Sequence, residues 1–486
     1  MKVKYLCTLL FGTAVLLFFG LAYPHHLHYQ EQYQLFLFDG DYVWDIVRHP
    51  GGVADLLGRF STQFFLYAWV GAAIIALLLT AVQLLTLRLF EGQRSKVEGQ
   101  RSKDEGQTTF NFQLSTFNFQ YAYGLSFVPP FLLWLFLLDE NALLGGVWAV
   151  LLTLLAIWGY VLLPGGWTRR AAVLLTVPVL YWAVGPSWYG THYHRYPTVL
   201  PALLYAAWLS ALLLPLLVRI LQRSQRFQRS TLTSYLLPLT SFALVSAVMG
   251  VLVWRSANFR AEKVMQYDFM ATHHQWNRIL EAIDREKPNN QIGVTVQNLA
   301  LAMHGMLPQR MFEYNQNGIA GLLPDVREDA TSPMPTAEAF YQLGMVSVAQ
   351  RTVFEAQEAI LDFQKSGRCY KRLAQTNLIN GDYEVARKYL AALQKTLFYR
   401  EWANATLPLL GDEEAIARHP EYGRLRRWAY REDFYFSDHV TPEMLRSLYL
   451  GCTDNAVAYQ YLLAYYMLTG DREGYIQLLQ ELGVKN

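Results

Sequence analysis

The sequence has few cysteines, almost no net charge and none of the short motifs that mark common enzymes. Its 486 residues contain three cysteines and no CxxC pair, which excludes a zinc knuckle or a dithiol redox centre of that spacing. Lys and Arg total 41 against 39 for Asp and Glu, so nucleic acid is not an expected partner. A GxxxxGK[ST] phosphate loop, an HExxH zinc helix and a GxSxG elbow are absent. No motif in the sequence therefore identifies an enzymatic reaction.

Long apolar runs occur only in the first half of the chain, and they predict a transmembrane domain over residues 1–254. A spanning helix needs about 20 predominantly apolar residues, and about seven stretches approach that length. They lie near residues 5–23, 63–90, 122–138, 143–163, 171–188, 199–221 and 235–254. The third is short and is either a span or a re-entrant segment. The first is either a cleaved signal peptide or an uncleaved anchor, and its length favours the anchor.

Basic residues alternate between the loops and predict the orientation of the spans. The residues that decide it are Lys2, Lys4, Arg88, Arg94, Lys96, Arg101, Lys103, Arg169, Arg170, Arg219, Arg223, Arg226 and Arg229. The loops between them are acidic. We therefore expect an inner-membrane protein with a cytoplasmic N-terminus, an external loop at 24–62 and an extracytoplasmic C-terminal domain. Residues 91–110, with their repeated Glu-Gly-Gln-Arg-Ser-Lys, are expected to be a flexible cytoplasmic insertion.

Residues 255–486 contain no apolar run of that length and predict a soluble α-helical domain. Residues 373–390 and 462–479 both have the pattern of a helix, a Gly-Asp turn and a second helix. Gly381 and Gly470 can take the left-handed conformation that ends a helix, and Asp382 and Asp471 can N-cap the next one. The prolines at 324–335 indicate a loop. Cys369 and Cys452 either pair as a disulfide or, more simply, stay unpaired.

These helix pairs resemble the tetratricopeptide repeat (TPR), without its strict 34-residue period. The resemblance implies an all-α architecture throughout: a polytopic bundle followed by a TPR-like repeat domain. Stacked helix pairs bury a shared core and leave a concave face on which partners or ligands bind. The alternative is a lid that covers the membrane domain and binds nothing.

The external loop holds the residues with the most suggestive chemistry. Asp39 and Asp41 are two positions apart, and carboxylates at that spacing can share a divalent cation or accept a proton from a hydroxyl group. A polar turn is the simpler interpretation, because Asp and Gly both favour turns. The nearby His25, His26 and His28 are either solvated or ligands of a transition metal.

The predicted topology resembles that of membrane glycosyltransferases of the GT-C fold, which have a large acidic first external loop and often an external C-terminal domain. The resemblance implies a polyprenyl-phosphate sugar donor, with Asp39 or Asp41 as the catalytic or metal-binding acid. It also implies that His192, His194 and Arg195 contact a lipid phosphate. This chain has Asp-Gly-Asp where an adjacent acidic pair is the commonest pattern.

The whole chain also resembles uncharacterised bacterial multispanning proteins with a TPR-like tail, and two functional hypotheses remain. The first is a cell-envelope protein whose repeat domain binds a partner or ligand, such as another envelope protein. The second is a GT-C-like glycosyltransferase that uses a lipid-linked sugar. Transport is not expected, because the spans contain almost no ionisable residues at mid-depth.

Overall fold

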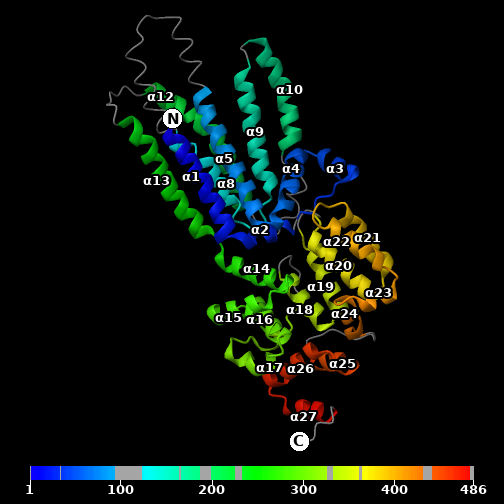
Figure 1. Cartoon of the computed structure of the whole chain (residues 1–486). Helices are drawn as coiled ribbons and strands as arrows, with labels where there is room; N and C mark the ends of the chain where they lie inside the picture. Colours follow the sequence, from blue (N-terminus) through cyan, green and yellow to red (C-terminus); the bar gives the residue numbers. More distant parts are fainter. Residues whose placement is uncertain are drawn as a thin grey trace, which may run out of the picture. The chain divides into compact units, whose positions relative to one another are not determined.

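The structure is all-α over the part of the chain that it describes. The computed structural model describes residues 2–32, 34–92, 123–163, 166–185, 199–224, 233–325, 332–360, 364–430 and 441–481. These residues form helices joined by turns and contain no β-strand (Figure 1). They divide into two compact units. The first unit comprises Met1–Glu31 and Phe38–Phe259, and the second comprises Gln32–Leu37 and Arg260–Asn486.

The first unit holds the apolar helices of the chain. Its elements are α1 (Lys2–Leu17), η1 (Phe18–Ala22), α2 (Pro24–Glu31), α3 (Gly40–Val47), α4 (Gly52–Thr62), η2 (Gln63–Leu66), α5 (Ala68–Gly92), α8 (Val128–Phe136), α9 (Leu144–Leu162), α10 (Trp167–Val184), α12 (Val199–Ser224) and α13 (Thr233–Ser256). Among the described residues, four helical stretches are long and apolar enough to cross a membrane. They are Tyr5–Ala22, Ala68–Phe90, Leu144–Leu162 and Pro238–Ser256. Three shorter apolar helices cover Tyr123–Phe136, Ala171–Val184 and Ala202–Leu217.

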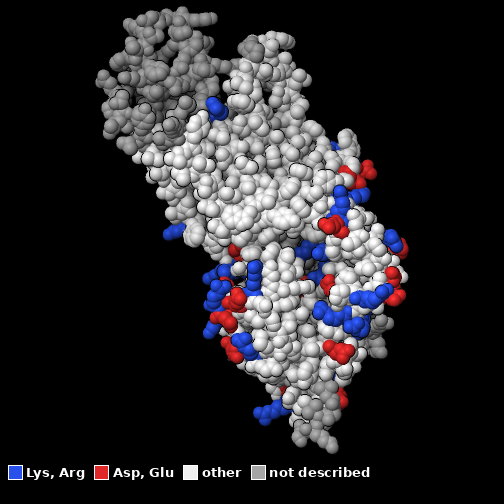
Figure 2. Space-filling model, in the orientation of Figure 1, with Lys and Arg blue, Asp and Glu red and all other residues white. Residues whose placement is uncertain are grey.

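The surface of the first unit is suited to a lipid bilayer. Large apolar side chains point outward from its helices, including Leu77, Leu174 and Leu244. Such a surface would be costly in water. On the face shown in Figure 2, charged side chains gather over the second unit and are sparse over the first. Four helices of sufficient length therefore support the predicted membrane association. The other three predicted spans correspond to the shorter helices.

A polar network inside the first unit connects α1, α5 and the segment before α8. Thr8 Oγ1 donates to Gln83 Oε1 at 3.1 Å, and Gln83 Nε2 donates to Ser126 Oγ at 2.9 Å. All three side chains are buried. Such bonds between helices stabilise packing where lipid offers no hydrogen-bonding partner. The network fixes the segment before α8 against two of the long apolar helices.

The second unit is a series of shorter, amphipathic helices. They are α14 (Phe259–Thr272), α15 (Trp276–Glu286), α16 (Gln291–Met303), α17 (Leu307–Arg310), η3 (Met311–Glu313), η4 (Gly318–Gly321), α18 (Pro333–Leu343), α19 (Val346–Glu358), α20 (Gly367–Asn380), α21 (Tyr383–Gln394), α22 (Arg400–Thr406), η6 (Leu407–Leu409), α23 (Glu413–Arg418), α24 (Tyr422–Trp428), α25 (Thr441–Gly451), α26 (Ala456–Thr469) and α27 (Arg472–Glu481). The pairs α18/α19, α20/α21 and α25/α26 each pack as neighbours, and α19 also packs on α20.

The predicted Gly-Asp turns are confirmed in their glycines and in one of their two aspartates. Gly381 and Gly470 end α20 and α26 with φ of 92° and 70°, which only glycine adopts readily. Asp471 caps α27 by accepting a hydrogen bond from Gly474 N at 2.9 Å. The capping prediction is wrong for Asp382, whose side chain makes no such bond. The predicted loop at 324–335 is also too long, because α18 begins at Pro333.

A short segment of the expected external loop belongs to the second unit. Leu35 N donates to Lys365 O at 2.8 Å, and Arg368 Nη1 donates to Gln32 Oε1 at 3.3 Å. Leu35 and Phe36 are both buried. We call Gln32–Leu37 the inserted segment. The chain thus passes from the first unit to the second, returns, and enters the second unit again at Arg260.

Candidate functional site

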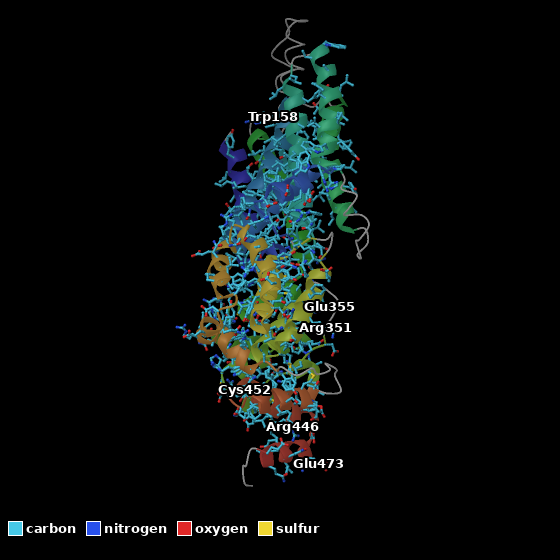
Figure 3. The ribbon with its side chains drawn as sticks, turned by 90° about the vertical axis from the view of Figure 1, so that its right-hand side faces the viewer. Trp158, Arg351, Glu355, Arg446, Cys452 and Glu473 are labelled. Atoms are coloured by element: carbon cyan, nitrogen blue, oxygen red, sulfur yellow. The ribbon has the colours of Figure 1, made fainter. Side chains whose placement is uncertain are left out.

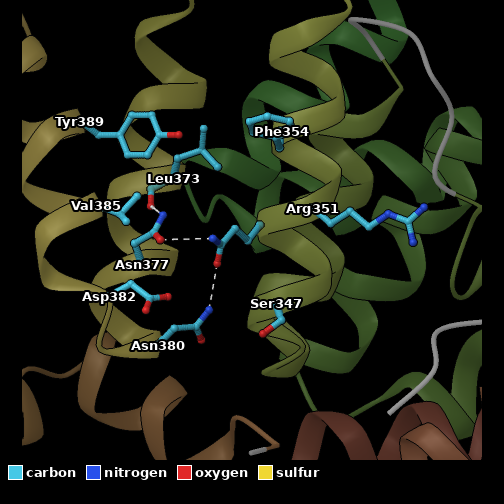
Figure 4. A pocket seen from close by; sticks show the side chains of 10 residues that line it. Ser347, Arg351, Phe354, Leu373, Asn377, Asn380, Asp382, Val385 and Tyr389 are labelled. Atoms are coloured by element: carbon cyan, nitrogen blue, oxygen red, sulfur yellow. Dashed lines mark hydrogen bonds between the residues drawn. The ribbon is translucent and has the colours of Figure 1, made fainter. Parts of the chain in front are cut away.

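A pocket of about 530 Å³ opens between α19, α20 and α21 of the second unit (Figure 4). Its lining residues are Ser347, Gln350, Arg351 and Phe354 of α19, Leu373, Asn377 and Asn380 of α20, Asp382 at the α20–α21 turn, and Val385 and Tyr389 of α21. Three successive helices of the series therefore build it. The pocket combines carboxamides, apolar side chains and one carboxylate.

The positions of the pocket helices follow from their caps and buried faces. Ser366 is the N-cap of α20, and its Oγ accepts a hydrogen bond from Cys369 N at 3.1 Å; Gly381 is the C-cap. Ala386 and Leu390 of α21 are fully buried, so α21 packs closely on α20. This packing turns Val385 and Tyr389 toward the pocket.

Three carboxamides form a continuous chain across the pocket. Asn380 Nδ2 donates to Gln350 Oε1 at 2.9 Å, and Gln350 Nε2 donates to Asn377 Oδ1 at 3.2 Å. Asn377 is buried and also donates to Leu373 O at 2.7 Å. This series of hydrogen-bonded carboxamides links α19 to α20 and holds the three side chains in fixed orientations (Figure 4). A carboxamide has two N–H donors and one acceptor oxygen, so the chain retains hydrogen-bonding capacity for a ligand.

The pocket lining contains one acidic side chain, Asp382, and one basic side chain, Arg351. Asp382 is exposed and has no ion-pair partner among the described residues. Arg351 points away from the pocket interior in Figure 4, and its Nε lies 3.9 Å from Glu355 Oε1 on the same helix. Both residues are labelled in Figure 3. Burial and the neighbouring Glu358 carboxylate raise the pKa of Tyr389. Acidic groups therefore lie at the Asp382 end and near Tyr389.

The structure gives Asp39 and Asp41 roles at the start of α3. Asp39 is the N-cap of this helix, and its Oδ1 accepts a hydrogen bond from Tyr42 N at 3.2 Å. Asp41 is exposed in the first turn, where a carboxylate is stabilised by the helix dipole. In the part of the chain that the structure describes, no group of three or more His, Cys, Asp and Glu side chains could hold a metal ion. A cation shared by Asp39 and Asp41 stays a prediction.

A half-buried ion pair next to α3 was not predicted from the sequence. Arg59 Nη2 donates to Asp55 Oδ2 at 2.8 Å, and its Nε contacts both carboxylate oxygens at 3.0 Å. Burial by itself would lower the pKa of Arg59, but Asp55 and Tyr42 raise it above its ordinary value. The signal was present, because an Asp and an Arg four residues apart on one helix are neighbours. The pair connects α4 to Tyr42 of α3.

The histidines of the external loop differ in their surroundings. His26 is fully buried, and its Nε2 lies 2.9 Å from Leu137 O. Burial lowers the pKa of His26 to about 4, against the opposing effect of this hydrogen bond. The rings of His25 and His28 are 5.7 Å apart. The contact of its ring with the backbone carbonyl of Leu137 indicates a structural role for His26.

The remaining sequence candidates are the C-terminal cysteines and the last external loop. Cys369 and Cys452 are free thiols, as the simpler interpretation expected. Cys369 is buried, and its Sγ lies 3.6 Å from Met334 Sδ. His192, His194 and Arg195 lie outside the described residues, so their contact with a lipid phosphate stays a prediction.

Comparisons with known proteins place the chain in a family. No curated protein and no solved structure is significantly similar to it. A family model matches residues 1–189 and 187–485, which together cover both units and nearly all of the sequence. The chain therefore belongs to DUF6057, a family of unknown function.

Proposed function

We propose that the protein is a membrane-anchored binding protein of the cell envelope. In this proposal the first unit lies in the bilayer, and the TPR-like second unit binds a partner protein through the pocket between α19, α20 and α21. The observation that carries the proposal is the pocket itself, with its chain of hydrogen-bonded carboxamides and the exposed carboxylate of Asp382. Four apolar helices support the membrane anchor.

The inserted segment supports the proposed orientation. It precedes α3 in the expected external loop and shares a compact unit with residues 260–486, so both must lie on one side of the membrane. The chain between them must then cross the membrane an even number of times. Among the described residues of that interval there are three long apolar helices, which is an odd number. One or all of the three shorter apolar helices would therefore also cross.

Seven spans satisfy this requirement when all three shorter helices cross. The helix that contains Ala202–Leu217 is α12, and its 26 residues give a length of about 39 Å at about 1.5 Å per residue. That exceeds the hydrocarbon thickness of about 30 Å. Together with the basic loops, seven spans favour an N-terminus in the cytoplasm and a second unit outside it.

Photo-crosslinking in cells tests the binding function. A photoreactive amino acid replaces Phe354, which lines the pocket and is 50% exposed. The control replaces Phe312, which is 60% exposed on η3 and does not line the pocket. We expect a discrete crosslinked protein adduct at position 354 and none at 312. No adduct at 354, or the same adduct at both positions, would contradict the proposal.

A second candidate function is a GT-C-like glycosyltransferase with a polyprenyl-phosphate sugar donor. The observation that favours it is Asp41, which is exposed on amphipathic α3 beside Trp44, itself 66% exposed. Amphipathic helices with exposed Trp suit a membrane interface. Asp39 and Asp41 would then hold a divalent cation, with His192, His194 and Arg195 near the phosphate. The purified protein would transfer sugar from such a donor, and Asp41→Asn would abolish transfer while Asp45→Asn would not.

A further inference from the structure

We infer that the pocket between α19, α20 and α21 recognises an extended peptide segment in which a basic side chain lies near an apolar one. The inference rests on the proposed binding function and specifies its ligand class. Three features of the pocket carry it: an exposed carboxylate with no cationic partner among the described residues, a chain of carboxamides, and two exposed apolar side chains.

The first feature is the availability of the Asp382 carboxylate. The aspartates at comparable helix starts are engaged, since Asp412 accepts from Ala415 N at 2.9 Å and Asp471 accepts from Gly474 N at 2.9 Å. Asp382 makes no capping bond and has no cationic partner among the described residues. Arg351, the basic residue of the lining, lies beside Glu355 instead. A ligand cation would therefore complement Asp382.

The second feature is the match between the carboxamides and a peptide backbone. An extended backbone presents N–H donors and C=O acceptors in alternation. Gln350 and Asn380 bond to each other at 2.9 Å, and each has a further N–H that no described residue accepts. Ser347 adds a hydroxyl group to the same lining. These groups can pair with backbone groups of a bound segment, as in strand-like peptide recognition.

The third feature is the apolar pair on the outer helices of the pocket. Phe354 of α19 is 50% exposed and Val385 of α21 is 40% exposed, although both line the pocket. A leucine-like side chain placed between them would remove apolar surface of all three groups from water. A neutral glycan would leave Asp382 without a cation, and a small polyamine would lack groups for the carboxamides. A peptide with one apolar and one basic side chain satisfies all three features.

The test uses the full-length protein in detergent and fluorescently labelled heptapeptides. Each peptide contains one Leu and one Lys separated by zero to three serines, and a matched set has Glu in place of Lys. Fluorescence anisotropy measures binding. We expect at least one Leu/Lys peptide to bind about tenfold more tightly than its Glu counterpart, because a charge-assisted hydrogen bond has about that effect.

Two pocket variants and one control variant locate the interaction. Asp382→Asn should remove the preference for Lys over Glu, whereas Glu384→Gln should keep it. Glu384 carries the same charge two residues further along, in the first turn of α21, but lies outside the pocket, 3.7 Å from Arg387. Phe354→Ala should weaken the peptide that binds best. Circular dichroism of each variant checks that its fold is retained.

Several outcomes would overturn the inference. The inference is wrong if Lys and Glu peptides bind equally or if Asp382→Asn keeps the preference for Lys. It is also wrong if the protein binds chitotriose and none of the peptides. Failure of this inference and failure of the proposed function are distinguishable. If position 354 crosslinks to a partner in cells while no peptide binds, the ligand class is wrong and the binding function stands. If position 354 also fails to crosslink, both are wrong.

Discussion

At the scale of single residues, Glu338 shows how the second unit holds a charge in its interior. Its side chain is 2% exposed and pairs with Arg372, whose guanidinium carbon lies 3.7 Å from the centre of the Tyr341 ring. Gln342 Nε2 donates to Glu338 Oε1 at 2.8 Å, and His274 lies 3.7 Å away. A buried carboxylate is tolerated only with such partners. α18 and α20 are therefore joined by a specific ionic contact as well as by apolar packing.

The stability of the second unit should depend on this carboxylate at low pH. Burial by itself would raise the pKa of Glu338, but Arg372, His274 and Gln342 lower it from 4.5 to about 2. The folded state then binds the proton less readily than the unfolded state. The stabilisation is fully present above about pH 4.5 and is lost as the pH falls to about 2. Glu338→Gln should cost about 3 kcal/mol at pH 7 and flatten this pH dependence.

Thermal unfolding of Glu338→Gln and of wild type between pH 7 and pH 2 measures both effects. Glu384→Gln removes an exposed carboxylate of the same unit and should behave like wild type. An unchanged melting temperature in Glu338→Gln at pH 7 would show that the buried pair does not stabilise the fold.

At the scale of the elements, the close crossing of α4 and α9 depends on glycine. A Cβ atom on Gly58 would lie 2.5 Å from Gly145 N and 2.7 Å from Gly145 Cα. Trp148 Nε1 donates to Ser61 Oγ at 3.0 Å next to this crossing. The two backbones thus approach as closely as small residues allow. This crossing holds the helix after α3 against one of the long apolar helices.

Gly58→Ala should separate these helices and destabilise the first unit by about 1–3 kcal/mol. Gly159→Ala is the matched control, because it lies on α9 and its added Cβ would meet nothing within 4 Å. That change should be neutral or slightly stabilising, since Ala favours helix over Gly. Thermal unfolding in detergent compares the two variants. Equal melting temperatures would mean that the crossing adjusts without cost.

Local patterns in the sequence predicted elements well and contacts poorly. The glycines at 381 and 470 were recognisable because a left-handed helix end requires a particular residue type. The pocket was not recognisable, because Gln350 and Asn380 are 30 residues apart and meet only through the packing of α19 on α20. The same holds for Glu338 and Arg372, which are 34 residues apart. Sequence periodicity gives the buried face of a helix but does not give its neighbour.

At the scale of the whole molecule, the inserted segment sets a condition on membrane topology. The charges of the loops predict orientation only through a statistical bias, whereas the inserted segment supplies a physical constraint. A segment cannot join the fold of residues 260–486 from the opposite side of a bilayer. The long apolar helices of the described residues give three crossings between the inserted segment and residue 260, which is an odd number. A total of five or seven spans gives an even number of crossings there and meets the condition.

Cysteine labelling with a membrane-impermeant maleimide tests this condition. In a Cys452→Ser background, we expect Asp41→Cys and Glu384→Cys to react in intact cells whose outer membrane is permeable. Both positions are exposed and lie on the side of the inserted segment. Ser95→Cys, in the expected cytoplasmic insertion, should react only after the inner membrane is opened. Reaction of positions 41 and 384 from opposite sides would contradict the shared unit. Protection of both would keep the even number of crossings but reverse the orientation, which separates the structural argument from the charge bias.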